Sequence, residues 1–103
     1  MGIPALRQAL LQTFLSDVHP RVERLAGAIA ARDAHQVEFE AHGLKGMAAT
    51  IGADACVQVF GEIESLGHDG RVSLADEALE RVRIEVERAS KFIEGTEGMR
   101  LAA

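Results

Sequence analysis

The sequence predicts an all-α domain: an antiparallel up-down four-helix bundle whose N-terminal helix is kinked or split. In four segments, apolar residues recur every three or four positions, which is the period of one helical face. The segments are joined by only a few residues, short enough to connect antiparallel neighbours. The apolar residues are mostly Leu, Val, Ile and Ala, with four Phe and no Trp or Tyr, a composition that suits packed helices.

The first predicted helix contains a long apolar stripe and an internal proline. The stripe keeps one helical phase through Leu11, Leu15, Val18, Val22, Leu25 and Ile29. Pro20 removes an amide donor and clashes with the preceding turn, so the helix either kinks there or restarts with Asp17 as its N-cap. The unbroken phase across Pro20 favours the kink.

The second predicted helix has a start signal and a stop signal. Asp33 followed by Gln36 matches a capping box, and Gly52 is the residue type expected just after a helix that ends near Ile51. Between them one apolar stripe predicts the buried face. It consists of Val37, Ala41, Leu44, Ala48 and Ile51.

The third and fourth helices follow with a turn between them. The third is predicted over about residues 53–66, with Cys56 packed in its apolar stripe as a small hydrophobic residue. Residues 67–70 form a turn, after which Ser73 and Asp76 are expected to cap the last helix. The apolar period of that helix continues to Ile93.

Length, charge and cysteine content limit the possible functions. The 103 residues allow one core, which we place in residues 1–94, with 95–103 as a flexible tail or linker remnant. A net charge of −5 and the absence of any basic run argue against a nucleic-acid partner. A single cysteine and no long apolar run predict a cytoplasmic monomer without direct membrane contact, or the cytoplasmic portion of a membrane-bound parent.

The second helix places His42 away from its predicted core face. With 100° per residue, His42 lies about 140° from the centre of that face, so its imidazole points outward. Gly43 and Gly46 each cost the helix about 1 kcal/mol relative to Ala, and what they contribute is the lack of a side chain beside the ring. An exposed imidazole can act as a nucleophile, and Lys45 on the same side can offset the charge of a group that the ring carries. A phosphoryl group fits this pattern.

The segment around His42 resembles the signature of histidine-containing phosphotransfer domains, the helical carriers of phosphorelays. The matching positions are Ala41, His42, Gly43, Leu44, Lys45, Gly46, Ala48, Ala49 and Gly52. Further similarity at residues 14–17, 25–33 and 63–64 extends the resemblance over about nine tenths of the chain. Met47 departs from the small residue that is frequent in the family, which bears on the choice of partner.

The resemblance implies a role for each site residue. His42 would accept and donate the phosphoryl group through its outer ring nitrogen, and Lys45 would screen the phosphoryl charge. Gly46 would leave room for the partner, and Glu64 would orient the imidazole by bonding its inner nitrogen. The partners implied are receiver domains, which would supply the aspartate and a divalent cation such as magnesium, and a parent hybrid histidine kinase. The chain itself shows no ATP site, so we expect a carrier and not a kinase.

We expect the receiver to dock on apolar residues in the opening turns of the first helix and on small residues near the histidine. These residues are Leu10, Leu11, Phe14, Gly43 and Ala49. Two other readings remain open: the substrate domain of a chemotaxis-type histidine kinase, and a helical docking or dimerisation module without phosphotransfer. No metal site is expected, because the Glu-x-x-His pattern of helical di-metal bundles does not occur.

Overall fold

The structure, a computed structural model, describes the backbone of residues 3–102 and the side chains of residues 4–95. Its elements are α1 (Ile3–Ala30), α2 (Ala34–Thr50), α3 (Asp54–His68), the 3₁₀ turn η1 (Val72–Leu74) and α4 (Ala75–Ala102). The predicted all-helical class is confirmed, and the described residues contain no strand.

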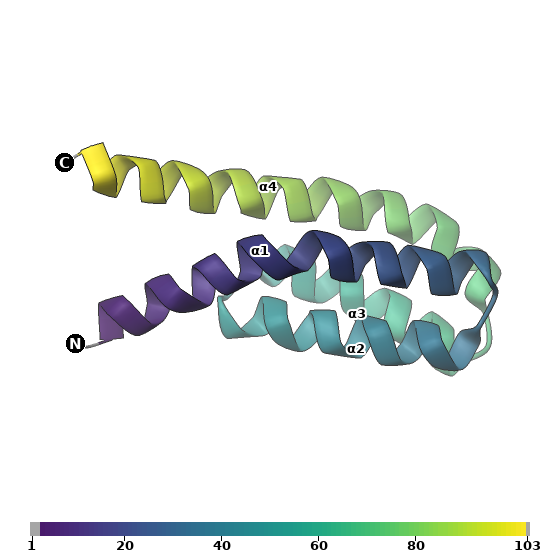
Figure 1. The fold of residues 1–103 in the computed structure, drawn as a ribbon. Helices are drawn as coiled ribbons and strands as arrows, with labels where there is room; N and C mark the ends of the chain where they lie inside the picture. Colours follow the sequence, from purple (N-terminus) through teal and green to yellow (C-terminus); the bar gives the residue numbers. More distant parts are fainter. Residues whose placement is uncertain (1–2, 103) are drawn as a thin grey trace.

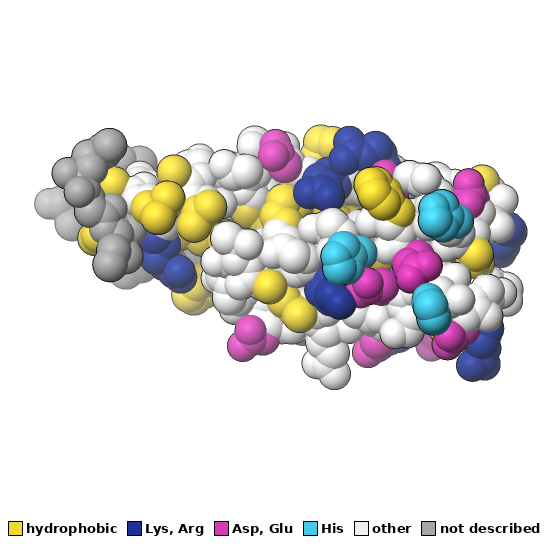
Figure 2. Space-filling view, turned by 90° about the horizontal axis from the view of Figure 1, so that it is seen from below, with side chains coloured by type: hydrophobic (Ala, Val, Ile, Leu, Met, Phe, Trp, Pro, Cys, Tyr) yellow, Lys and Arg dark blue, Asp and Glu magenta, His cyan; other side chains and the backbone are white. Residues whose placement is uncertain are grey.

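The arrangement of the helices is seen in Figure 1. The shorter helices α2 and α3 form a hairpin that packs against the longer α1 and α4. Towards the two chain ends, α1 and α4 continue past this hairpin. The interface between α2 and α3 is the most extensive of the helix interfaces. The face of this hairpin that points away from α1 and α4 is open to solvent (Figure 2).

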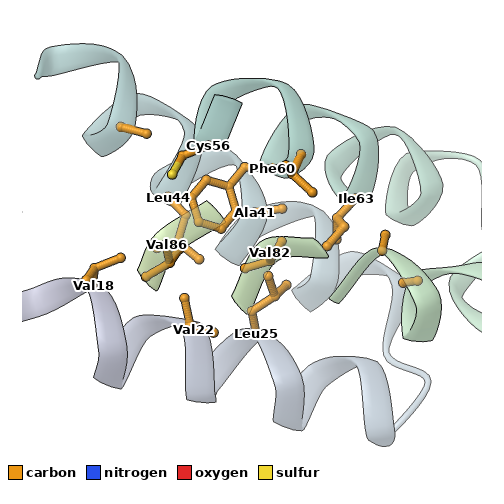
Figure 3. Close-up of a cluster of buried hydrophobic side chains, with 14 of the residues drawn as sticks. Val18, Val22, Leu25, Ala41, Leu44, Cys56, Phe60, Ile63, Val82 and Val86 are labelled. Carbon is orange, nitrogen blue, oxygen red and sulfur yellow. The ribbon is translucent and has the colours of Figure 1, made fainter. Parts of the chain in front are cut away.

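The core combines apolar side chains from all four α-helices (Figure 3). The predicted stripe of α2 is buried along its whole length, so the orientation of this helix is confirmed. Cys56 is 2% exposed and its thiol donates to the Glu85 carbonyl at 3.4 Å. Burial, with the Glu85 charge as a smaller cause, raises the pKa of the Cys56 thiol to about 11, which fits a packing role.

The ends of α2 follow the predicted signals in part. The Asp33 carboxylate accepts from the Gln36 backbone N–H at 3.1 Å, so Asp33 is the N-cap. The Gln36 side chain does not complete the capping box, because its amide donates to Glu40 instead. At the other end Gly52 adopts a φ of 73°, the left-handed conformation that glycine takes at low cost. Backbone bonds from Gly52 and Ala53 then close the last turn.

The first and last helices agree with the predictions in part. The first helix is continuous through Pro20, so it is not split, whereas the kink stays a prediction. Ser73 lies inside η1, and the Asp76 carboxylate pairs with Arg32 at 2.8 Å, so the predicted capping box is wrong. The last helix continues past Gly95 to Ala102, farther than its apolar period. The domain boundary at residue 94 stays a prediction.

The opening turns of α1 do not offer the spare apolar surface that the sequence predicts. Phe14 is fully buried and Leu11 is 6% exposed, because α1 packs against both α2 and α4 and therefore buries a face wider than one stripe. For these two residues a docking role on the surface is wrong. Leu10 is partly buried against the core, and Leu6 is a large apolar side chain at this end of α1 that is 62% exposed.

Candidate functional site

His42 lies in the middle of α2 and points away from the core. Its side chain is 71% exposed, while Ala41 before it and Leu44 after it are fully buried. The outward position follows from the helical period alone, because the residues that flank His42 belong to the buried stripe. A ring in this position can be reached by a group on another protein.

Glu64 on α3 holds the inner nitrogen of the His42 ring. Its Oε2 atom lies 2.7 Å from Nδ1 of His42, and its Oε1 atom lies 2.6 Å from Nζ of Lys45. The hydrogen bond from Lys45 lowers the pKa of the Glu64 carboxyl, a smaller lowering comes from His42, and partial burial opposes both. The carboxylate therefore stays ionised at neutral pH and can only accept, so Nδ1 carries the ring proton. The lone pair of the neutral ring is then on Nε2, the outer nitrogen.

The two glycines of the motif have different surroundings. A Cβ atom at Gly46 would have no atom within 4 Å, so the surface one turn beyond His42 is open. A Cβ atom at Gly43 would collide with the Nη2 atom of Arg21, whose guanidinium reaches across from α1. The expectation that Gly43 offers bare docking surface is therefore wrong, because Arg21 covers it. Arg21 was missed because no local pattern in α1 links it to a residue of α2.

A second histidine–glutamate pair lies beside the first. His68 at the end of α3 and Glu38 on α2 approach to 3.1 Å between Nδ1 and Oε2. The two pairs cross from one helix to the other, and this order requires α2 and α3 to run in opposite directions. Among the side chains of residues 4–95, no group of three or more His, Cys, Asp or Glu is placed to hold a metal ion.

The surface around these pairs is hollowed and mixed in character (Figure 2). Histidine side chains gather there among acidic ones over α2 and α3. An open hollow of about 420 Å³ is lined by His35, Glu38, Phe39, His42 and Glu64. Phe39 is 67% exposed, an apolar side chain at the site that the sequence reasoning did not single out. Ala49, predicted to contact the partner, is exposed farther along α2.

Comparison with known proteins assigns the chain to a family. The family model of the Hpt domain matches residues 9–92, which is most of the chain. The chain therefore belongs to the Hpt domain family, whose members are histidine-containing phosphocarriers of two-component signalling and interact with receiver and kinase partners. Neither the curated proteins nor the solved structures include a match to it. Within the part of the chain that the structure describes, no helix is long and apolar enough to span a membrane.

Proposed function

We propose that this chain is a phosphorelay intermediate that takes a phosphoryl group from a receiver aspartate onto His42 and passes it to a second receiver. The observation that carries the proposal is the contact between Nδ1 of His42 and Glu64 at 2.7 Å. It leaves the nucleophilic nitrogen on the exposed side of the ring, opposite the carboxylate.

The transfer step needs no proton to leave the ring. The lone pair of Nε2 attacks phosphorus, the bond between phosphorus and the aspartyl oxygen breaks, and the aspartate carboxylate departs with the electron pair. The product ring carries the phosphoryl group on Nε2 and the original proton on Nδ1, so the ring gains positive charge. Glu64, already ionised and in contact with Nδ1, stabilises that charge.

Lys45 and Gly46 support the same step in different ways. The Lys45 ammonium lies beside the ring through its pairing with Glu64, where it would offset the negative charge of the phosphoryl oxygens. The open surface at Gly46 would admit the rim of the receiver's active site. The receiver would bring the magnesium ion, since the step needs a divalent cation next to the aspartyl phosphate. Such a carrier would act in the cytoplasm, as a free protein or as the cytoplasmic portion of a hybrid kinase.

A transfer experiment with matched histidine variants tests the proposal. Receiver domains from the same genome, phosphorylated on aspartate with a small phosphodonor, are mixed with the wild-type chain, His42→Gln or His68→Gln in the presence of magnesium. We expect rapid labelling of the wild type and of His68→Gln and none of His42→Gln. His68 is the proper control because its side chain is 74% exposed and also paired with a glutamate. Labelling of His42→Gln would overturn the proposal, and labelling by a kinase domain but by no receiver would favour the kinase-substrate reading.

A further inference from the structure

Arg21 places a guanidinium group immediately beside the helical turn that carries His42. The side chain leaves α1, is partly buried, and lies over the space that a side chain at Gly43 would occupy. Its Nη1 atom lies 3.8 Å from the Met47 sulfur. Gly43 and Met47 lie one turn apart on the side of α2 that faces α1, and the guanidinium packs against both of them.

This guanidinium is poorly supplied with hydrogen-bond acceptors. The Nε atom of Arg21 is buried and has no partner, and the contact to Met47 is with a thioether, a weak acceptor. No carboxylate of the described residues lies within 4.0 Å of Arg21, whereas Arg24, one turn along α1, pairs with Glu40 at 3.6 Å. A partly buried donor without an acceptor destabilises the free protein. A binding partner cannot reach the buried Nε, but it can reach the Nη end of the guanidinium, which has no carboxylate acceptor among the described residues.

The position of Arg21 indicates which partner group it would meet. With 100° per residue, Gly46 and Gly43 lie about 40° and 100° from His42 on one side, and Lys45 lies about 60° away on the other. The guanidinium therefore lies beyond the open surface at Gly46, at the edge of the site. Lys45, on the other side of the ring, is the cation next to His42. An oxyanion at Arg21 would belong to the surface of the docked protein and not to the phosphoryl group on Nε2.

We propose that Arg21 is a positioning residue that orients the receiver by pairing with an acidic side chain on the receiver's surface, an inference that rests on the proposed phosphotransfer function. A guanidinium donates two parallel hydrogen bonds to a carboxylate, which fixes orientation as well as distance. The chain carries a net charge of −5, so an acidic receiver surface is repelled on the whole and attracted at a few local cations. The side chain at position 43 has to be absent for Arg21 to take this place.

The test separates docking from chemistry. Phosphoramidate loads His42 without a receiver: the bond between phosphorus and nitrogen of phosphoramidate breaks, ammonia leaves, and phosphorus bonds to Nε2. Transfer from the loaded chain to a receiver domain is then followed at rising receiver concentrations for the wild type, Arg21→Gln and Arg21→Lys. Arg88→Gln is the matched control, because it makes the same change in charge on α4 instead of beside the site.

We expect all four proteins to load with phosphoramidate at the same rate. For Arg21→Gln the receiver concentration at half-maximal transfer rate should rise about fivefold, with the maximal rate unchanged and a weaker dependence on salt. The half-maximal receiver concentration for Arg21→Lys should lie between those of the wild type and Arg21→Gln, and that for Arg88→Gln should equal the wild-type value. An unchanged half-maximal concentration for Arg21→Gln, or a defect confined to the maximal rate, would overturn the role of Arg21.

Gly43→Ala provides an independent variant. Its Cβ atom displaces the guanidinium without removing any charge, so it should raise the half-maximal receiver concentration as Arg21→Gln does, and it should add nothing in an Arg21→Gln background. Alanine also favours the helix over glycine, so we expect Gly43→Ala to stay folded, which circular dichroism checks. Additive effects of the two changes would contradict the proposal. If the loaded wild type transfers to no receiver of the genome, the proposed shuttle function fails and the role of Arg21 fails with it.

Discussion

The two histidine–glutamate pairs between α2 and α3 look alike, yet their surroundings differ. The side chains of His42 and His68 are 71% and 74% exposed, and each Nδ1 meets a glutamate of the other helix. Exposure and pairing therefore do not distinguish a reactive histidine from a structural one. The two pairs differ in whether the carboxylate also contacts a lysine, and in the surroundings of the nearest glycine.

At the His42 pair, the carboxylate also binds a lysine, and the neighbouring glycine is open. Glu64 is 20% exposed and contacts Lys45 at 2.6 Å, and Gly46 faces solvent. The His68 pair is longer, and Glu38 is 36% exposed. The glycine beside this pair, Gly67, is buried against the backbone of α2. A Cβ atom added at Gly67 would lie 2.7 Å from the backbone nitrogen of Glu38. One glycine clears space for a partner and the other lets two helices approach closely.

Closing the open surface beside His42 should have the largest effect. Gly46→Gln puts a side chain where the receiver must approach, so we expect transfer to slow by about a hundredfold or more while the helix content is kept. Gly95→Gln is the matched control, because a side chain there also meets open space and lies on α4. Transfer at the wild-type rate by Gly46→Gln would show that this clearance does not matter. Stopped-flow or quenched labelling gives the rates.

Removing the carboxylate of each pair in turn separates the two pairs directly. Glu64→Gln removes the charge that favours the ring proton on Nδ1 and should slow transfer by about ten- to a hundredfold, as the loss of an orienting partner commonly does. Glu38→Gln makes the same chemical change at the other pair and should leave the rate as it is. Equal effects of the two substitutions on the transfer rate would mean that the pairs are not functionally distinct.

The two glycines should respond oppositely to alanine in urea unfolding. Gly67→Ala forces α2 and α3 apart and should lower the free energy of unfolding by roughly 1–3 kcal/mol. Gly46→Ala meets no atom and should raise it by about 1 kcal/mol through helix propensity. A loss of stability in Gly46→Ala would show that this position is packed and not open.

The smallest expected effect is the pH dependence of stability at the His42 pair. Because the folded-state pKa of Glu64 is lowered, its contribution is present above the unfolded pKa of about 4.3 and is lost as the pH falls through the lower folded value. Wild type should thus exceed Glu64→Gln in unfolding free energy by about 1 kcal/mol at pH 7. The difference should disappear well below pH 4. A difference that persists at that pH would need another cause.

The sequence predicted what depends on one helix at a time. The buried stripe of α2 and the outward direction of His42 follow from the helical period, and the Asp33 and Gly52 signals mark the ends of that helix. The contact between Glu64 and His42 was expected from the family resemblance, and the structure brings the two residues together.

Contacts between helices were less predictable. The burial of Phe14 and the placement of Arg21 over Gly43 depend on how each neighbouring helix is rotated about its own axis. The apolar period within one helix does not determine how the neighbouring helix is rotated. The contact between Glu38 and His68 also crosses the α2–α3 interface, and the sequence did not predict it for the same reason.

The most direct test of the account locates the phosphoryl group on the loaded protein. The chain, labelled with ¹⁵N in its histidines and phosphorylated by a receiver, is examined by NMR for coupling between phosphorus and nitrogen. We expect one phosphohistidine, with phosphorus on Nε2 of His42 and the proton on Nδ1. Phosphorus on Nδ1 of His42, or on His35 or His68, would contradict it.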